Sequence, residues 1–297
     1  MDGHTTAHGV RADVEQLVAP FRPRLSGLAF RLLGSFADTD RALARTQELL
    51  VEVGPAEADV GDWLTLTTAQ VSLEILRLRA AGPPAFPWAL PDFVVTTEPA
   101  HDPGQAALLG GAAGTALFAT LHALDPMTRA AHVLHDTHGM PYEVLGPQVL
   151  DLSAADAEEL AALGRAATRD VAVPDADVER QHTAVRTFYR VARRGEHDPI
   201  IELFHPSFRL QNDSGEHVLS GVFEGPEEVV QRAVLITRAD LRLHPALING
   251  AAGVVVSNAS AVVALASFTV VDGLLVRVDT LGDSTRIPLY DIPGLVL

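Results

Sequence analysis

The chain has 297 residues, a length typical of two domains, and a net charge of −16 in which all 22 basic residues are arginine. It has no cysteine, which excludes disulfides and thiolate chemistry. No apolar run approaches the roughly 20 residues that span a bilayer, and the N-terminus lacks the features of a signal peptide. We therefore expect a cytoplasmic protein with no membrane partner. The acidic total argues against a nucleic-acid binder unless a local basic patch exists.

Apolar residues recur at helical spacing through the first 170 residues. A first helical domain is expected at residues 1–80, with helices at 12–34, 38–53 and from 62 to about 80. A second is expected at 105–170, with helices at 105–123, 127–137, 141–149 and 153–169. The last two helices, joined by a short turn, have the outline of a helix-turn-helix.

Residues 81–104 separate the two helical domains and contain six prolines with no helical period. This pattern predicts a mostly extended linker. Its aromatic residues Phe86, Trp88 and Phe93 would be unfavourable in water, so we expect the linker to pack on a protein surface with these side chains largely buried.

The sequence pattern changes at Val178 and predicts a third domain at 178–297. Helices are expected at 179–195, 198–204 and 226–237, and strands at 208–211, 241–249, 252–258, 260–271 and 273–281. Helices followed by a curved antiparallel sheet are typical of a cone-shaped α+β fold. The predicted fold class is therefore multidomain, with an all-α N-terminal half and an α+β cone domain.

Several stretches in order resemble one family, the extracytoplasmic-function (ECF) sigma factors with a fused SnoaL-like (NTF2-like) domain. Sigma region two is similar to FRPRLSGLAFRLLGSFADTDRA, and region four to ALDPMTRAAHVLHDTHGMPYEVLGPQVL. The linker motif of this subgroup is similar to PWALPDFVVT. The SnoaL-like domain resembles the chain from ERQHTAVRTFYRVARR onward, including INGAAGVVV and VVDGLLVRV. The resemblance implies RNA polymerase and promoter DNA as partners.

The predicted recognition helix departs from the family pattern. Residues 141–170 hold two arginines and six acidic residues, a net charge of −4 on a surface that should meet DNA. Family members usually carry basic residues where Glu158 and Leu163 stand. Pro147 lies inside the preceding helix, where proline is unfavourable, and Asp151 replaces a glycine at the turn. DNA binding is therefore not expected.

Other family motifs are altered as well. Arg45 and Gln47 replace an acid and an aromatic in the helix that the resemblance assigns to polymerase contact and promoter melting, which puts RNA polymerase binding in doubt. The glycine-rich turn becomes Asp213-Ser214-Gly215-Glu216-His217, and the C-terminal motif becomes Leu281-Gly282-Asp283-Ser284. The resemblance ties both of these motifs to self-regulation, so that role is in doubt too.

A metal site and a small-molecule site are the two chemical hypotheses. His132 and His135 have a usable ligand spacing, but this stretch matches ordinary region-four sequence, so we expect neither a metal nor a cofactor. The cone is the usual design of a small-molecule pocket. The resemblance implies an acid–base pair inside it, and the candidates are His244, Asp213, Asp279, Tyr189, His205 and His217.

Two of these candidates have structural alternatives. Asp279 could form a surface ion pair with Arg277, and His244, between Leu243 and Pro245, could be a hydrogen-bonded core or rim histidine.

Three functions stay open at this point. The first is a sigma-like protein that has lost promoter binding and binds or transforms a small apolar, polyketide-like metabolite, as a cofactor-independent cyclase, isomerase or hydrolase of natural-product biosynthesis if it is an enzyme. The second is a working ECF sigma factor that is regulated by its SnoaL-like domain. The third is a partner-binding regulator.

Overall fold

The computed structural model describes residues 14–55, 59–83, 86–96, 108–109, 114–194, 197–215, 218–233, 240–290, 292 and 295. The chain forms two compact units. One comprises residues 1–84, 102–110 and 120–169, and the other residues 85–101, 111–119 and 170–297. Most of the predicted linker thus belongs to the C-terminal unit. None of the described helices has the length and apolar character needed to cross a membrane.

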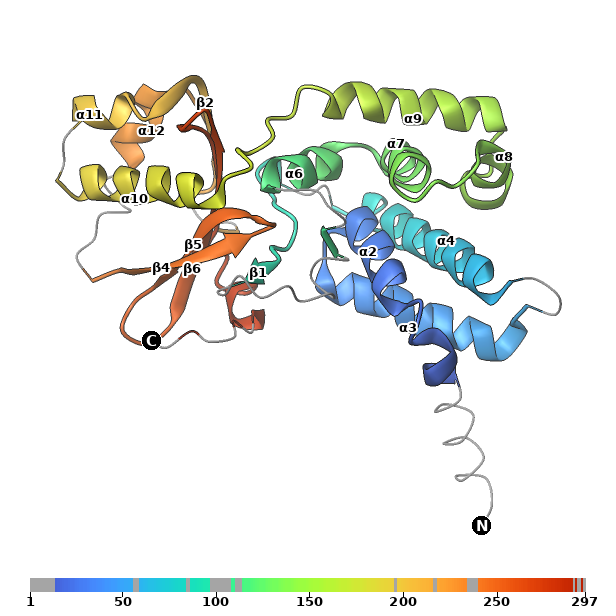
Figure 1. Ribbon diagram of the computed structural model, residues 1–297. Coiled ribbons are helices and arrows are strands. Elements are labelled where there is room, and N and C mark those ends of the chain that lie inside the picture. The colour runs from blue at the N-terminus through green and yellow to red at the C-terminus, as the bar shows by residue number, and fades with distance from the viewer. Residues whose placement is uncertain are drawn as a thin grey trace, which may run out of the picture. The chain divides into compact units, whose positions relative to one another are not determined.

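The N-terminal unit is helical (Figure 1). Its longer helices are α2 (Arg22–Leu33), α3 (Phe36–Val53), α4 (Val60–Ala80), α7 (Pro126–His132) and α9 (Ala154–Thr168). The short α8 (Tyr142–Leu145) precedes α9, and α6 (Thr115–Ala123) crosses the boundary between the units. The first predicted helix, 12–34, is interrupted by a turn at residues 19–21, because Pro20 lacks the N–H that a continuous helix requires.

Two π-helical turns, Val133–Thr137 and Gly146–Leu150, continue α7 and α8. Pro147 lies at the start of the second one, so the widened turn accommodates the proline that the sequence places inside a helix. Asp151 follows with φ of 60° and ψ of 42°, a left-handed conformation that Asp tolerates better than most residues. The predicted helix-turn-helix is therefore formed despite both departures.

His138 is a pH-sensitive point of this unit. Its Nε2 atom is buried and is hydrogen-bonded to no described group. Burial, together with the charges of Arg31 and Arg24, lowers the pKa of His138 to about 4 from its usual 6.5. The folded protein therefore keeps this imidazole neutral at a pH at which the unfolded chain would protonate it.

We expect the free energy of unfolding to be unaffected by His138 above pH 6.5 and to fall as the pH decreases toward 4. The cause is that the unfolded chain binds a proton on His138 that the folded chain does not. The loss approaches about 3 kcal/mol, since one pKa unit corresponds to about 1.4 kcal/mol. Urea unfolding of the wild type and of His138→Gln at pH 7 and pH 4.5 measures it. The variant should lose less stability on acidification, and an identical loss in both proteins would contradict the assignment.

The C-terminal unit is built on one seven-stranded sheet with the order β1-β4-β5-β6-β7-β2-β3. The strands are β1 (Val95–Thr96), β2 (Phe204–Asp213), β3 (Gly221–Glu224), β4 (Arg242–Ile248), β5 (Ala251–Ser257), β6 (Val262–Val271) and β7 (Leu274–Leu281). Only β2 and β7 pair in parallel among these strands. The predicted turns Asn249-Gly250 and Asp272-Gly273 have positive φ angles and join antiparallel neighbours.

Each face of this sheet has its own core. The helices α10 (Val178–Arg194), α11 (His197–Ile201) and α12 (Pro226–Ala233) lie over one face, where Phe188, Phe208 and Phe268 are buried (Figure 1). The linker packs on the other face, where Phe93 is buried beside Ile248. The predicted α+β cone is confirmed, but the sheet is mixed rather than antiparallel as expected, because β2 and β7 pair in parallel.

Candidate functional site

The helix-covered face of the sheet encloses a cavity of about 350 Å³, a size within the range of small-molecule sites. It lies among α10, α12 and strands β2, β3, β5, β6 and β7, and is lined by Phe188, Tyr189, Phe208, Leu210, Asn212, Ser214, Leu219, Phe223, Val229, Asp240, Leu241, Val256, Asn258, Val263, Ala264, Ala266, Phe268, Val278 and Thr280. Most of these side chains are apolar, so the cavity suits an apolar ligand with a few polar groups.

The alternation of side chains along the strands decides what faces this cavity. On β2, Phe208, Leu210 and Asn212 face it, and on β7 Val278 and Thr280 do so. The residues between them point to the linker side of the sheet. Asp279 near the end of β7 is one of these intervening residues, and Asp213 follows Asn212 at the end of β2, so both lie outside the cavity.

Tyr189 is the one predicted candidate that the structure places in the described cavity lining. It extends from α10 and packs edge-on against Phe268. Burial raises the pKa of Tyr189 above its usual value, so the phenol stays neutral near pH 7. A neutral hydroxyl can donate a hydrogen bond to a ligand carbonyl, but it is a poor proton acceptor. Apart from Tyr189, Asp240 is the only titratable group among the described lining residues.

Asp213 lies on the opposite face of the sheet, which corrects the expectation that it projects into the pocket. Its carboxylate accepts a hydrogen bond from the backbone N–H of Leu90 at 2.9 Å and pairs with Arg286 at 2.8 Å. The Asp213 side chain is 6% exposed. This geometry gives Asp213 a role in holding the linker.

Asp279 also faces the linker side rather than the cavity. It pairs with Arg277 at 2.7 Å, as the structural alternative predicted, but the pair is buried, with side chains 1% and 12% exposed. Burial raises the pKa of Asp279 above its usual value, although the charge of Arg277 acts in the opposite direction. Arg277 also donates to the side chain of Gln211 at 2.9 Å, so the carboxylate is fixed in a structural network.

None of the three candidate histidines is among the described cavity-lining residues. His244 shares the linker face with Ala246, and its Nε2 lies 2.8 Å from the hydroxyl of Ser257, which agrees with the alternative of a hydrogen-bonded rim histidine. His205 is exposed at the start of β2 and contacts Ser207. His217 lies outside the described residues.

The histidines of the metal hypothesis have protein partners. His132 Nδ1 lies 2.6 Å from a carboxylate oxygen of Asp136, and His135 Nδ1 lies 2.9 Å from the carbonyl oxygen of Met140. Across the described part of the chain, no group of three or more potential ligand side chains could hold a metal ion.

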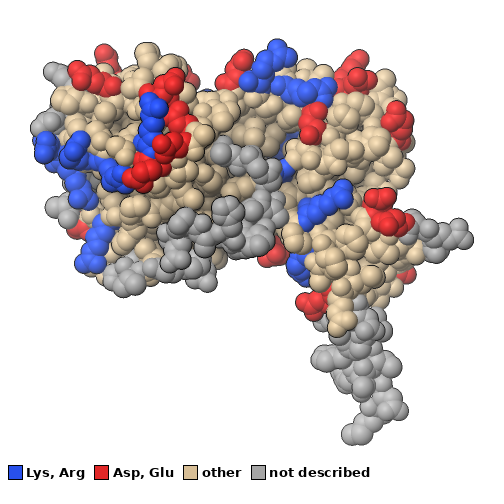
Figure 2. All heavy atoms as spheres, in the orientation of Figure 1, with Lys and Arg blue, Asp and Glu red and all other residues tan. Residues whose placement is uncertain are grey.

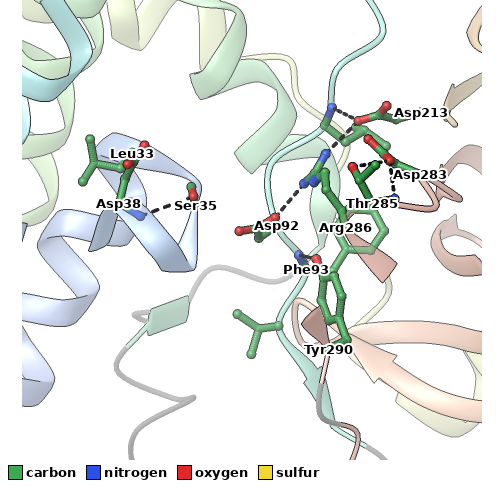
Figure 3. A network of polar contacts seen from close by, with 12 residues as sticks. Leu33, Ser35, Asp38, Asp92, Phe93, Asp213, Asp283, Thr285, Arg286 and Tyr290 are labelled. Carbon is green, nitrogen blue, oxygen red and sulfur yellow. Dashed lines mark hydrogen bonds and ion pairs between the residues drawn. The ribbon is translucent and has the colours of Figure 1, made fainter. Parts of the chain in front are cut away.

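Residues 86–96 are fastened to the C-terminal unit by a network that sequence reasoning missed (Figure 3). Arg286 lies between two carboxylates, Asp92 at 2.7 Å and Asp213 at 2.8 Å. Burial alone would lower the pKa of Arg286, but Asp92 and Asp213 raise it above its usual value. The hydroxyl of Tyr290 accepts a hydrogen bond from the N–H of Phe93 at 2.8 Å.

The linker aromatics are buried to different degrees. Phe93 is fully buried, Trp88 is half-buried and donates from Nε1 to the carbonyl of Gly215, and Phe86 is 44% exposed while stacked on Trp88. Residues 86–96 pack on the sheet unit as expected, but Phe86 is less buried than predicted. Residues 97–104 lie outside the described residues.

In the N-terminal unit, α9 is the second helix of the helix-turn-helix. A Cβ atom at Gly164 would lie 2.4 Å from Cβ of His132, so this glycine lets α9 pack closely on α7. Glu158, Glu159 and Leu163 are exposed on α9, and Leu163 is 60% exposed. Arg165 is held by Asp136 at 2.8 Å. The exposed part of the helix is therefore acidic and apolar.

No family model matches the chain, but its relatives include sigma factors. The chain is 30% identical over 216 residues to the ECF RNA polymerase sigma factor SigJ of Mycobacterium tuberculosis, a match that spans 71% of this chain and 69% of that protein. The crystal structure of Mycobacterium tuberculosis SigJ has a TM-score of 0.72 and 25% identity, and the match covers 93% of this chain and 98% of that one.

Proposed function

Because the chain belongs to the ECF RNA polymerase sigma factors, we propose that it acts in transcription initiation as a sigma subunit whose activity is set by its C-terminal unit. The observation that supports this most is the likeness of nearly the whole chain, both units included, to one sigma factor. The complete helix-turn-helix of α8 and α9 adds support, since its fold survives Pro147 and Asp151.

The acidic surface of α9 determines how strongly the chain alone is expected to bind DNA. An exposed helix with Glu158 and Glu159 repels phosphates, so the chain alone should bind promoter DNA weakly. In the proposed function, RNA polymerase supplies most of the DNA contacts. The test is whether the purified chain makes core RNA polymerase start RNA synthesis at defined positions on the DNA of its own organism.

The apolar cavity supports a second candidate function, the binding of a small apolar metabolite. In this proposal the C-terminal unit holds the ligand without converting it, since the described lining offers Tyr189 and Asp240 but no buried acid–base pair. The binding function is compatible with a working sigma factor, in which the ligand would be a regulator. It is equally compatible with a chain that has lost promoter recognition.

A cavity-filling variant tests this second candidate. Ala264 lines the cavity on β6, so Ala264→Phe should weaken binding of an uncharged apolar probe, N-phenyl-1-naphthylamine, at least about tenfold because the ring takes up ligand space. Probe fluorescence in a titration measures this. Ala261→Phe, at an exposed position of the preceding turn, is the matched control and should leave the affinity unchanged. No probe binding to the wild type, or equal binding to both variants, would contradict a ligand cavity.

A further inference from the structure

A second hollow, of about 480 Å³, lies beside α10 on the helix-covered face of the sheet. It is lined by His182, Val185, Arg186, Tyr189, Arg190, Arg193, Arg194, Leu243, Pro245 and Val254. These residues come from α10 and from the neighbouring strands β4 and β5. We call this hollow the arginine groove.

The helical period explains why arginines gather there. Gln181, Val185, Phe188 and Ala192 bury one side of α10 on the sheet. Four of the groove residues, His182, Arg186, Arg190 and Arg193, recur three or four positions apart and form an adjoining stripe on the same helix. Figure 2 shows basic side chains gathered over this part of the C-terminal unit, although the whole chain carries a net charge of −16.

Most of these guanidinium groups are not neutralised by the described part of the chain. Arg186 pairs with the exposed Glu179 at 2.6 Å. Arg193 donates to the carbonyl of Leu241 at 3.1 Å, and Arg190 has a 3.5 Å contact with the hydroxyl of Thr187. No described carboxylate forms an ion pair with Arg190, Arg193 or Arg194. Three exposed cations therefore border one hollow without a carboxylate partner among the described residues.

The floor of the groove is apolar. Leu243 and Pro245 of β4 and Val254 of β5 form it, and Pro245 is exposed. The phosphates of a nucleic acid would pair with the arginines but would make no apolar contact with this floor. A ligand with an anionic head and an apolar body matches both parts, because a guanidinium binds carboxylate or phosphate oxygens through two parallel hydrogen bonds.

We propose that the arginine groove binds an amphipathic organic anion, with a carboxylate or phosphate head on Arg190 and Arg193 and an apolar body against Leu243 and Pro245. This site is separate from the cavity inside the cone, although Tyr189 lines both. It does not depend on the proposed transcriptional function.

Calorimetric titration of the full chain with four probes below their micellar concentrations tests the proposal. Decanoate and decyl phosphate carry head and body, decanol lacks the charge, and inorganic phosphate lacks the body. We expect the first two to bind at least about tenfold more tightly than the last two, since a charged hydrogen bond contributes roughly that factor. Comparing the affinity for decanoate with that for decyl phosphate shows whether the groove prefers a carboxylate or a phosphate head group.

Variants locate the binding. Arg190→Ala combined with Arg193→Ala should weaken binding of the amphipathic anions by about 100-fold, and both residues are exposed, so the fold should persist. Arg180→Ala is the matched control, because Arg180 is exposed on the same helix but does not line the groove. It should leave the affinities unchanged.

Three outcomes would overturn the proposal. An uncharged alcohol such as decanol suits the cavity inside the cone. Anion binding that is no tighter than decanol binding, and that is insensitive to the double variant, would therefore assign all binding to that cavity. Equal binding of inorganic phosphate would indicate non-specific anion attraction. Binding of duplex DNA or a polyglutamate peptide that depends on Arg190 and Arg193, without decanoate binding, would make the groove a macromolecular surface instead. Transcription by the double variant, measured in parallel, keeps these outcomes distinct from failure of the proposed function.

Discussion

Arg286→Ala should destabilise the C-terminal unit by about 3 kcal/mol and release the linker. Removing Arg286 leaves the nearly buried carboxylate of Asp213 without its counter-charge, and the loss of one partner of a buried pair typically has an effect of this size. The link from Asp92 to the sheet domain is lost at the same time. Denaturant unfolding measures the stability change, and limited proteolysis within residues 86–96 measures the release.

Two further variants test whether the effect belongs to the network. Arg286→Lys keeps the charge but cannot contact both carboxylates in the same geometry, so it should give an intermediate loss. Arg242→Ala removes an exposed arginine of β4 and should change the unfolding free energy by less than about 0.5 kcal/mol. An Arg286→Ala protein as stable and as resistant to proteolysis as the wild type would show that the network does not hold the linker.

Reversing the charge of α9 should convert a poor DNA binder into a better one. Glu158→Arg with Glu159→Arg changes the helix by four charge units and adds two phosphate-binding groups on an exposed surface. We expect affinity for a non-specific duplex at low salt to rise at least about tenfold, and its salt dependence to become steeper by roughly two counterions. Fluorescence anisotropy with a labelled duplex measures both, and the wild type should show no sub-micromolar binding on its own.

The matched control reverses two acids far from the helix-turn-helix in sequence. Glu227→Arg with Glu228→Arg makes the same charge change at exposed positions of α12. If the geometry of α9 matters, this control should raise the affinity less than the α9 pair does. An equal rise in both double variants would mean that only net charge counts and that α9 has no special relation to DNA.

Local patterns predicted the elements well and their long-range partners poorly. Along β7, the alternation of side chains puts Val278 on the helix side of the sheet and Arg277 with Asp279 on the other side, where a pair of Arg277 with Asp279 was expected as the structural alternative. Leu275 departs from this alternation, because the register of β6 and β7 shifts between Thr269 and Val270 and brings Leu275 into the helix-side core. A bulge of this kind leaves no clear mark in a single sequence.

The site was harder to predict than the fold. The predicted strand ended at residue 211, whereas β2 extends to Asp213, so the face on which Asp213 lies could not be assigned. Its partners Leu90 and Arg286 are 123 and 73 positions away in the chain. Local periodicity carries no information about such pairings. The resemblance to sigma factors, by contrast, rested on several motifs in order and is confirmed by the relatives.

The central claim is tested most directly by transcription from defined DNA in vitro. Core RNA polymerase from the same organism would be supplied with a library of its genomic fragments, with and without the purified chain, and the RNA 5′ ends would be mapped. We predict that the chain adds a small set of reproducible start sites that share a sequence element upstream. RNA start sites that are the same with and without the chain, together with no association between the chain and core polymerase, would contradict a sigma function.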